Sequence, residues 1–198
     1  MSTSRAEAFS DGVFAIAITL LVINLLPIKS DLAHHWPDYA AFAFSFIVIG
    51  VMWVNHHHLM DQLERADRVL LFLNLLLLMG VVVIPFPTIL VAQHLTDTGG
   101  NANAAVVTYG LVMIAISLGF AGLWIYVATH APALGAAVPP EALRRSIPGF
   151  TGGLIAYVVG TLIALFRPLA ALIIFGLLAV YYLFEHLPSP AEERPPAW

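Results

Sequence analysis

Long stretches without charge most restrict what this chain can fold into. Its 198 residues include uncharged runs of 17 to 43 residues, the longest between Asp97 and Glu141, and the charges gather where loops would fall. A helix needs roughly 20 apolar residues to cross the hydrocarbon core of a bilayer. The runs therefore predict an integral membrane protein. With 10% charged and 60% hydrophobic residues, the chain is not an ordinary soluble enzyme, a disordered protein or a nucleic-acid binder, which needs a basic face.

The runs predict an all-α protein with six transmembrane helices. The predicted spans are 7–26, 38–60, 68–91, 103–129, 143–166 and 168–185. They make residues 1–187 one six-helix transmembrane domain. The tail 188–198 holds four prolines and is predicted to be disordered.

Local features predict how some spans bend and pack. Pro85 and Pro87 predict a kink near the outer end of the third span. The short turn at Arg167-Pro168 predicts that the last two spans form a tight antiparallel hairpin. Small residues on one face of the fifth span predict close helix packing within the subunit. They are Gly149, Gly153, Ala156, Gly160 and Ala164.

Basic residues predict the orientation. Six spans put both termini on one side, and a cytoplasmic N-terminus gives six arginines inside against two basic residues outside. The inside set is Arg5, Arg65, Arg68, Arg144, Arg145 and Arg194, and the outside set is Lys29 and Arg167. Because Lys and Arg favour cytoplasmic loops, both termini are predicted to be cytoplasmic.

The first span carries two apolar stripes behind a polar entrance. Ser10 and Asp11 could cap the helix while Arg5 sits among headgroups, or the three could be functional, as ionisable groups near a membrane helix often are. One stripe is Gly12, Ile16, Thr19, Leu20 and Ile23, and the other is Phe14, Ala17, Leu21 and Leu25. Periodicity alone does not say which stripe faces a pore, because both are suited to packing.

The polar entrance belongs to a longer motif. The run Arg5-x-x-x-Phe9-Ser10-Asp11-Gly12, continued to Val22, closely resembles the signature first helix of the endosomal and lysosomal potassium-channel family, in its bacterial branch. The segment 53–58, Trp-Val-Asn-His-His-His, and Asn74 with the Pro-Phe-Pro-Thr of 85–88 are similar to that family's second and third helices. Together these motifs cover about half of the chain, and the last three spans carry none.

The resemblance implies a homotetramer in the bacterial plasma membrane, with a central pore lined by the first helix. It implies weak to moderate selectivity for potassium over sodium without a carbonyl filter. Ile16 matches the family's narrowest position, and Leu20 and Ile23 would extend this constriction. Such an apolar ring gates by dewetting. Thr19, one turn further on, matches a hydroxyl position and is expected, with Ile16, to set selectivity.

The resemblance also implies a polar network that ties the first helix to its neighbours. Its candidate members are Arg5, Phe9, Ser10, Asp11, Trp53, His57, His58 and Asn74. Asp11 is the natural acceptor, and Trp53, Asn74 and one of the two histidines are the candidate donors, because polar groups within a membrane must be satisfied by protein.

Other functions remain open at this stage. A secondary transporter would show charges near the midplane, and the span centres have none. A haem protein could use His56, His58, His94, His130 or His186. We expect no enzyme, because no plausible nucleophile and base lie together within a span. We expect no cofactor and no metal site, since neighbouring histidines of a helix point about 100° apart and the chain has no cysteine. The expected partners are copies of the chain, lipid and permeant monovalent cations, potassium above all, with no nucleic acid.

Overall fold

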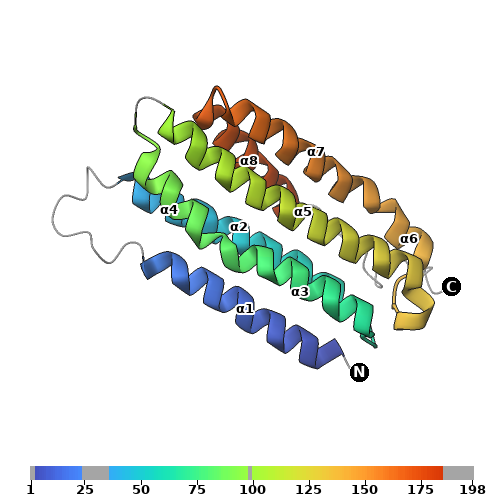
Figure 1. The fold of residues 1–198 in the computed structure, drawn as a ribbon. Coiled ribbons are helices and arrows are strands. Elements are labelled where there is room, and N and C mark those ends of the chain that lie inside the picture. Colours follow the sequence, from blue (N-terminus) through green and yellow to red (C-terminus); the bar gives the residue numbers. More distant parts are fainter. Residues whose placement is uncertain (1–2, 24–35, 98–99, 185–198) are drawn as a thin grey trace.

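The fold is a bundle of helices. The computed structural model describes residues 3–23, 36–97 and 100–184, and every regular element in these ranges is helical (Figure 1). The elements are α1 (Thr3–Ile23), α2 (Trp36–Asp61), α3 (Arg68–Val83), α4 (Pro85–His94), α5 (Asn101–Leu134), α6 (Pro140–Arg145), α7 (Ile147–Ala164) and α8 (Pro168–Phe184). The predicted all-helical architecture is confirmed. Leu25, Lys29, His186 and the tail 188–198 with Arg194 lie outside the described residues.

Helix length and composition support the predicted spans. Among the described residues, five helices or helix pairs are long and apolar enough to cross a membrane. The apolar α8 is shorter, with 17 residues. Four predicted spans differ most in their bounds: the first begins at Thr3, the third is α3 plus α4, the fourth extends to the 34 residues of α5, and the fifth begins with the short α6 before α7.

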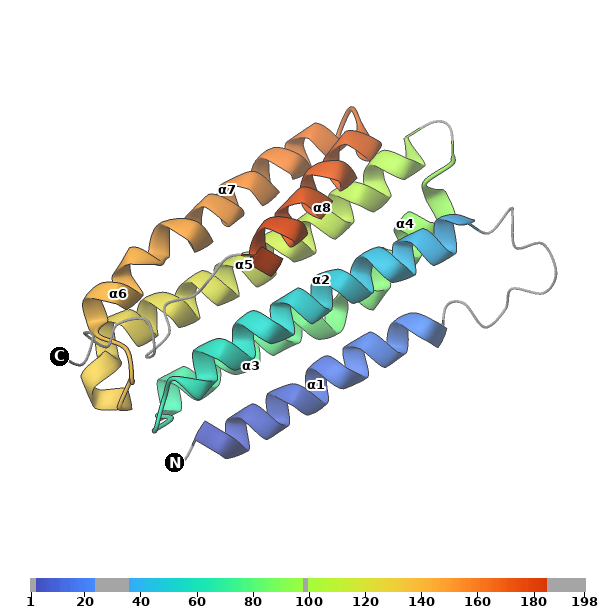
Figure 2. The same ribbon diagram turned by 180° about the vertical axis from the view of Figure 1, so that it is seen from behind.

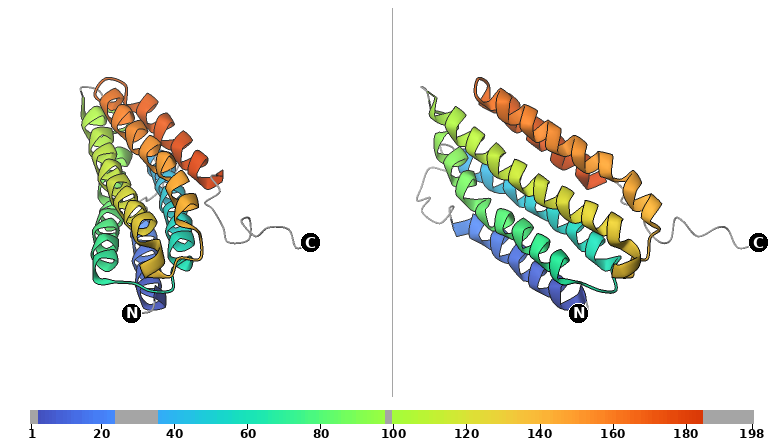
Figure 3. Two further views of the ribbon diagram at one scale, coloured as in Figure 1. Left: turned by 90° about the vertical axis from the view of Figure 1, so that its right-hand side faces the viewer. Right: turned by 45° about the vertical axis from the view of Figure 1, so that its right-hand side comes forward.

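The helices form a layered arrangement with α1 at one edge and α7 and α8 at the opposite edge (Figures 1 and 2). Helix α1 packs against α2, α3 and α4, whereas α7 packs against α5 and α8. Figure 3 shows the same order from two further directions. One side of α1 is therefore not covered by any other helix of the single chain.

The predicted kink of the third span is confirmed as a break between α3 and α4 at Ile84. Pro85 has no N–H to donate, and the Ile84 N–H instead donates to the Val81 carbonyl at 3.1 Å. After the break, the Thr88 hydroxyl donates to the Ile84 carbonyl at 2.8 Å and lies 2.8 Å from the Ser45 hydroxyl of α2. The Ile84 N–H thus satisfies the Val81 carbonyl, which Pro85 leaves without its usual donor, and the Ser45–Thr88 contact joins α4 to α2.

The predicted hairpin of the last two spans is also confirmed. Helices α7 and α8 pack along each other after the turn at Arg167-Pro168. Gly160 lies so close to the Phe175 ring that an added Cβ would be 2.6 Å from Cε1. Ala164 is fully buried. The small residues therefore let aromatic rings of α8 approach the α7 backbone.

The end of the bundle that holds the N-terminus is closed by paired connections. The Arg65 N–H donates to the Leu134 carbonyl at 3.1 Å, and the Ala137 N–H donates to the Gln62 carbonyl at 2.9 Å. The chain leaves α5 through Gly135, whose φ of 64° suits glycine. These bonds join the α2–α3 connection to the α5–α6 connection. Together the two connections fix the ends of α2, α3 and α5 near the N-terminus of α1.

Candidate pore helix and its polar network

The two stripes of α1 have opposite surroundings. The described members of the second stripe, Phe14, Ala17 and Leu21, are buried against the bundle. Every member of the first stripe is exposed: Gly12, Ile16, Thr19, Leu20 and Ile23. Ile16 and Ile23 keep 57% and 53% of their surface exposed. The single chain thus buries one stripe and leaves the other without a protein neighbour.

Thr19 is the polar member of the exposed stripe. Its hydroxyl donates to the Ile16 carbonyl of its own helix at 2.9 Å. Because the hydroxyl proton is used within the helix, the oxygen lone pairs remain for an outside donor or cation. Thr19 therefore presents an acceptor beside the apolar Ile16.

A buried chain of hydrogen bonds joins α1, α2 and α3. Ser10 donates to the Ala6 carbonyl at 2.8 Å, and the Asn74 amide nitrogen donates to the Ser10 oxygen at 2.9 Å. The Asn74 amide oxygen lies 2.7 Å from His56 Nε2. Since that oxygen can only accept, His56 Nε2 is the donor. All three side chains are nearly inaccessible to solvent.

A second set of contacts joins α1 and α2 nearer to the surface. The Trp53 indole N–H donates to the Asp11 carboxylate at 2.8 Å. One turn away, His57 Nδ1 lies 2.7 Å from the Glu7 carboxylate, and the His57 ring stacks on the Trp53 ring. Glu7 and Asp11 are four residues apart on α1, and Trp53 and His57 are four residues apart on α2. Each pair therefore lies on one face of its helix, and the two faces contact each other at both positions.

Three predicted members of the network stand apart in the single chain. Arg5, Phe9 and His58 are exposed and form no hydrogen bond or ion pair with the described residues. Asn74 donates to Ser10 and not to Asp11. Trp53 and Asp11 come together as the sequence suggested.

Sequence reasoning placed neither His56 nor Glu7 in the network. His56 is the histidine that reaches Asn74, and Glu7 is the partner of His57. His56 lies on the same face of α2 as the buried Ile49, seven residues or two helical turns away, and the sequence alone does not show which face of α2 is buried. The family resemblance drew attention to the neighbouring histidines instead.

The remaining described histidines lie away from this network. His94, at the end of α4, is 2.8 Å from Asp97, and hydrogen bonds from His94 and Asn101 hold the pKa of the Asp97 carboxyl below its usual range. His130, near the end of α5, stacks on Tyr126. Within the described ranges, no three His, Asp or Glu side chains gather as metal ligands.

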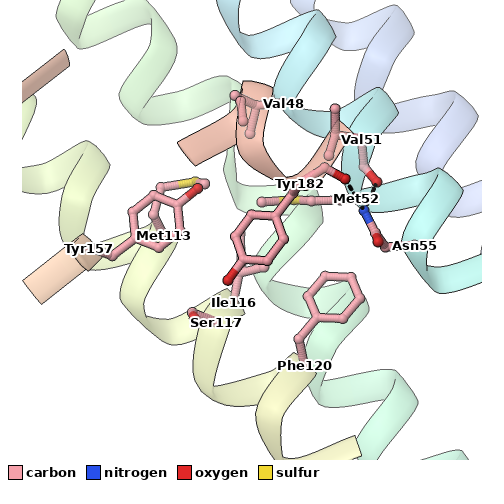
Figure 4. A pocket seen from close by; sticks show the side chains of 11 residues that line it. Val48, Val51, Met52, Asn55, Met113, Ile116, Ser117, Phe120, Tyr157 and Tyr182 are labelled. Carbon is pink, nitrogen blue, oxygen red and sulfur yellow. Dashed lines mark hydrogen bonds between the residues drawn. The ribbon is translucent and has the colours of Figure 1, made fainter. Parts of the chain in front are cut away.

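A small cavity lies away from α1, between α2, α5, α7 and α8. Its volume is about 50 Å³, and Figure 4 shows its lining, which is mostly apolar. The Asn55 amide donates to the Val51 carbonyl at 2.8 Å and to the Tyr182 carbonyl at 3.4 Å. These bonds satisfy the Asn55 amide and link α2 to α8. We therefore interpret the cavity as imperfect packing between these helices.

Comparison with known proteins finds channels. Residues 5–85 match the family described as endosomal/lysosomal potassium channel TMEM175. A protein named potassium channel from Streptomyces collinus is 41% identical, over 96% of each chain. A Gallus gallus protein named endosomal/lysosomal proton channel TMEM175 is 28% identical, with 66% of this chain aligned to 29% of that one.

A solved structure has the same fold. The crystal structure of a lysosomal potassium-selective channel TMEM175 homolog from Chamaesiphon minutus superposes with a TM-score of 0.79. The match is 34% identical and covers 91% of this chain and 96% of that chain. The likeness therefore includes the three last spans, for which the sequence offered no motif.

Proposed function

This chain belongs to the family of the endosomal/lysosomal potassium channel TMEM175, and on that premise we propose that it is a potassium channel. Four copies surround a central pore in the bacterial plasma membrane, and α1 of each copy lines it. No cofactor takes part, and the ligand is the permeant potassium ion. One observation carries the proposal: α1 lies at the edge of the bundle with its first stripe exposed.

The exposed stripe suits a hydrophobic constriction. Ile16 forms the narrowest ring of the proposed pore, and Leu20 and Ile23 extend it. A narrow neck without hydrogen-bonding groups expels water, and ions cannot cross until it widens. The buried opposite stripe supports this arrangement, because it packs against the bundle and leaves the first stripe free to face a central axis.

Weak to moderate selectivity for potassium over sodium follows from the same ring. Potassium gives up hydration water more readily than sodium, so partial dehydration in an apolar neck favours potassium. The Thr19 hydroxyl donates its proton to the Ile16 carbonyl, so its oxygen can contact the ion in place of part of the lost water. Ile16 and Thr19 together set the preference.

The arginines support cytoplasmic termini. The five described arginines of the predicted inside set belong to the start of α1, the α2–α3 connection and the α6 segment, which share one end of the bundle (Figure 1). Arg167 lies in the α7–α8 turn at the other end. This separation fits the preference of basic residues for the cytoplasmic side.

Flux from liposomes tests the channel itself. The purified protein is reconstituted and exposed in turn to potassium, sodium and proton gradients. We expect potassium flux above sodium flux, without coupling between the gradients. Absence of flux under every gradient would exclude a channel, strictly coupled flux would favour a transporter, and visible absorbance of the purified protein would favour haem.

Two substitutions test the proposed pore residues. Ile16→Asn should raise conductance because an amide ring keeps the neck wet, and Thr19→Val should lower the potassium-to-sodium permeability ratio because it removes the acceptor. Currents and reversal potentials measure both. Ile173→Asn makes the same change on an exposed site of α8 and should alter neither property. Unchanged currents and permeability ratios in both α1 variants would disprove the assignment.

A further inference from the structure

His56 has one ring nitrogen without a partner at the junction of α1, α2 and α3. Its side chain is fully buried, and its Nδ1 has no hydrogen-bond partner among the described residues. The ring lies 5.4 Å from the Phe14 ring of α1, between centroids. Buried polar atoms are usually paired, so such an atom calls for an explanation.

The order of donors in the buried chain fixes the state of this nitrogen. Ser10 donates to Ala6, Asn74 donates to Ser10, and His56 Nε2 donates to Asn74. A neutral imidazole that donates from Nε2 carries a lone pair on Nδ1. The series of hydrogen bonds therefore ends at one basic atom, His56 Nδ1, which is enclosed beside the buried face of α1.

We infer that proton uptake at His56 Nδ1 loosens α1 from α2 and α3, which makes His56 a positioning residue that couples the pore helix to proton concentration. The neutral ring fits its enclosed site, but an imidazolium there has an N–H without an acceptor and a charge without solvent. Burying an unpaired charge is costly. The cost is relieved when α1 moves enough to admit water or a carboxylate. The consequence for the pore rests on the proposed function of α1.

The surrounding charges do not remove this cost in the described arrangement. On α1, Glu7 is bound to His57 and Asp11 to Trp53. On α2, His57 would oppose a second positive charge nearby, and the exposed His58 and Asp61 point away from the buried chain. On α3, the charged residue Arg68 is exposed and lies over Phe72. A carboxylate reaches His56 Nδ1 only if these contacts rearrange.

A glutamine at position 56 separates the hydrogen bond from the titration. His56→Gln places an amide nitrogen where Nε2 stood, so it keeps a donor for Asn74 but takes up no proton. The control is His58→Gln, because His58 is exposed and has no polar contact with the described residues. Potassium flux is measured in liposomes between about pH 8 and about pH 5, where histidine titrates.

We expect the parent channel and His58→Gln to change flux several-fold across this range, and His56→Gln to keep its flux near the value at the alkaline end. An equal pH response in parent and His56→Gln would overturn the inference. A parent channel whose flux is independent of pH would overturn it as well. Flux at the alkaline end tests the channel proposal by itself, so the two failures are distinguishable.

Thiol labelling tests the movement without relying on flux or on the folding of His56→Gln. The chain has no cysteine, so Ala17→Cys on the buried face and Ala15→Cys on the exposed face are single probes for a neutral maleimide. The ratio of their labelling rates cancels the effect of pH on the thiol. We expect the ratio of buried to exposed labelling to rise at least several-fold on acidification. A constant ratio would refute the loosening of α1.

Discussion

Adjacent residues of the first-helix motif have different tasks. Ser10 points inward and accepts from Asn74 in a site closed to solvent, whereas Asp11 is half-buried and accepts from Trp53 at the side of the helix. A 100° rotation per residue separates the two. Ser10 therefore anchors α1 to α3 through a buried bond, and Asp11 anchors it to α2 through an outer one.

Asp11→Ala should weaken assembly more than selectivity. It removes the acceptor of the Trp53 indole, which costs about 1 kcal/mol and loosens the α1–α2 contact that positions α1 in the proposed pore. Size-exclusion chromatography should show less tetramer, while channels that do form keep their permeability ratio. Asp61→Ala is the control, because Asp61 is exposed at the end of α2. A normal tetramer with normal currents would contradict this role.

The sequence predicted part of the network, missed His56 and Glu7, and included Arg5, Phe9 and His58, which stand apart in the single chain. The motif indicated Ser10, Asp11, Trp53 and Asn74, and these lie at the α1–α2–α3 junction. Which of three successive histidines turns inward depends on the rotation of α2, and that rotation is fixed by packing of α2 against α1, α4 and α8. Tertiary contacts thus decided what the local pattern left open.

At the scale of elements, one glycine sets the distance between α5 and its neighbours. A Cβ on Gly110 would lie 3.0 Å from Thr161 Cβ and 3.1 Å from Phe175 Cζ. Gly110→Ala should therefore lower stability by about 1–3 kcal/mol through overpacking. Gly122→Ala, on the same helix with open space around it, should be neutral or stabilising by up to about 1 kcal/mol. Thermal unfolding in detergent compares the two, and equal effects would refute the packing argument.

The start of α3 depends on a carboxylate outside the spans. Asp67 accepts from the Leu70 N–H at 2.8 Å and from the Tyr126 hydroxyl at 2.5 Å, and these bonds hold the pKa of its carboxyl below the usual range. A lowered folded-state pKa means that the charged form contributes stability above the unfolded pKa of about 3.9, and that this contribution is lost as pH falls through the folded value.

Asp67→Ala should consequently cost about 1 kcal/mol at neutral pH as the cap is lost, with a lower melting temperature. Asp67→Asn keeps a capping oxygen without the charge, so its deficit relative to the parent should shrink as pH falls below the unfolded value. Melting temperatures of the three proteins over an acid series measure this. A deficit of Asp67→Asn that is constant with pH would rule out a contribution from the charge.

Helix existence was predictable from apolar content, and so were the helix starts at Arg68 and Pro168, but the other helix ends were predicted less well. The third span contains Pro85 and Pro87, and α3 and α4 are interrupted at the single residue Ile84, whose N–H bonds to the Val81 carbonyl while its backbone stays in the right-handed helical region. The fourth prediction, 103–129, stopped five residues before the end of α5 at Leu134. That end is held by contacts with the α2–α3 connection, which hydropathy does not register.

At the scale of the molecule, different interactions hold the helices together on the two sides of the bundle. Helices α5, α7 and α8 pack closely through glycines and aromatic rings, and the polar network lies on the other side, where α1 meets α2 and α3. The side that holds α1 therefore relies on a few buried hydrogen bonds, whereas the opposite side relies on close packing of helices. The proposed tetramer accounts for the exposed apolar stripe of α1 through neighbouring copies of the chain.

Disulfide formation at Ile16 tests that explanation. In a tetramer lined by α1, four copies of Ile16 surround the axis, and a disulfide forms when two Cα atoms lie within about 4.4–6.8 Å. Ile16→Cys, the single cysteine of the chain, should give a covalent dimer of the 21.4 kDa subunit under mild oxidation and lose flux until it is reduced. Ile173→Cys, equally exposed but on α8 at the opposite edge, should stay monomeric on a denaturing gel. Equal cross-linking at both sites would mean random collision, and cross-linking at Ile173 alone would place α8 and not α1 at the centre.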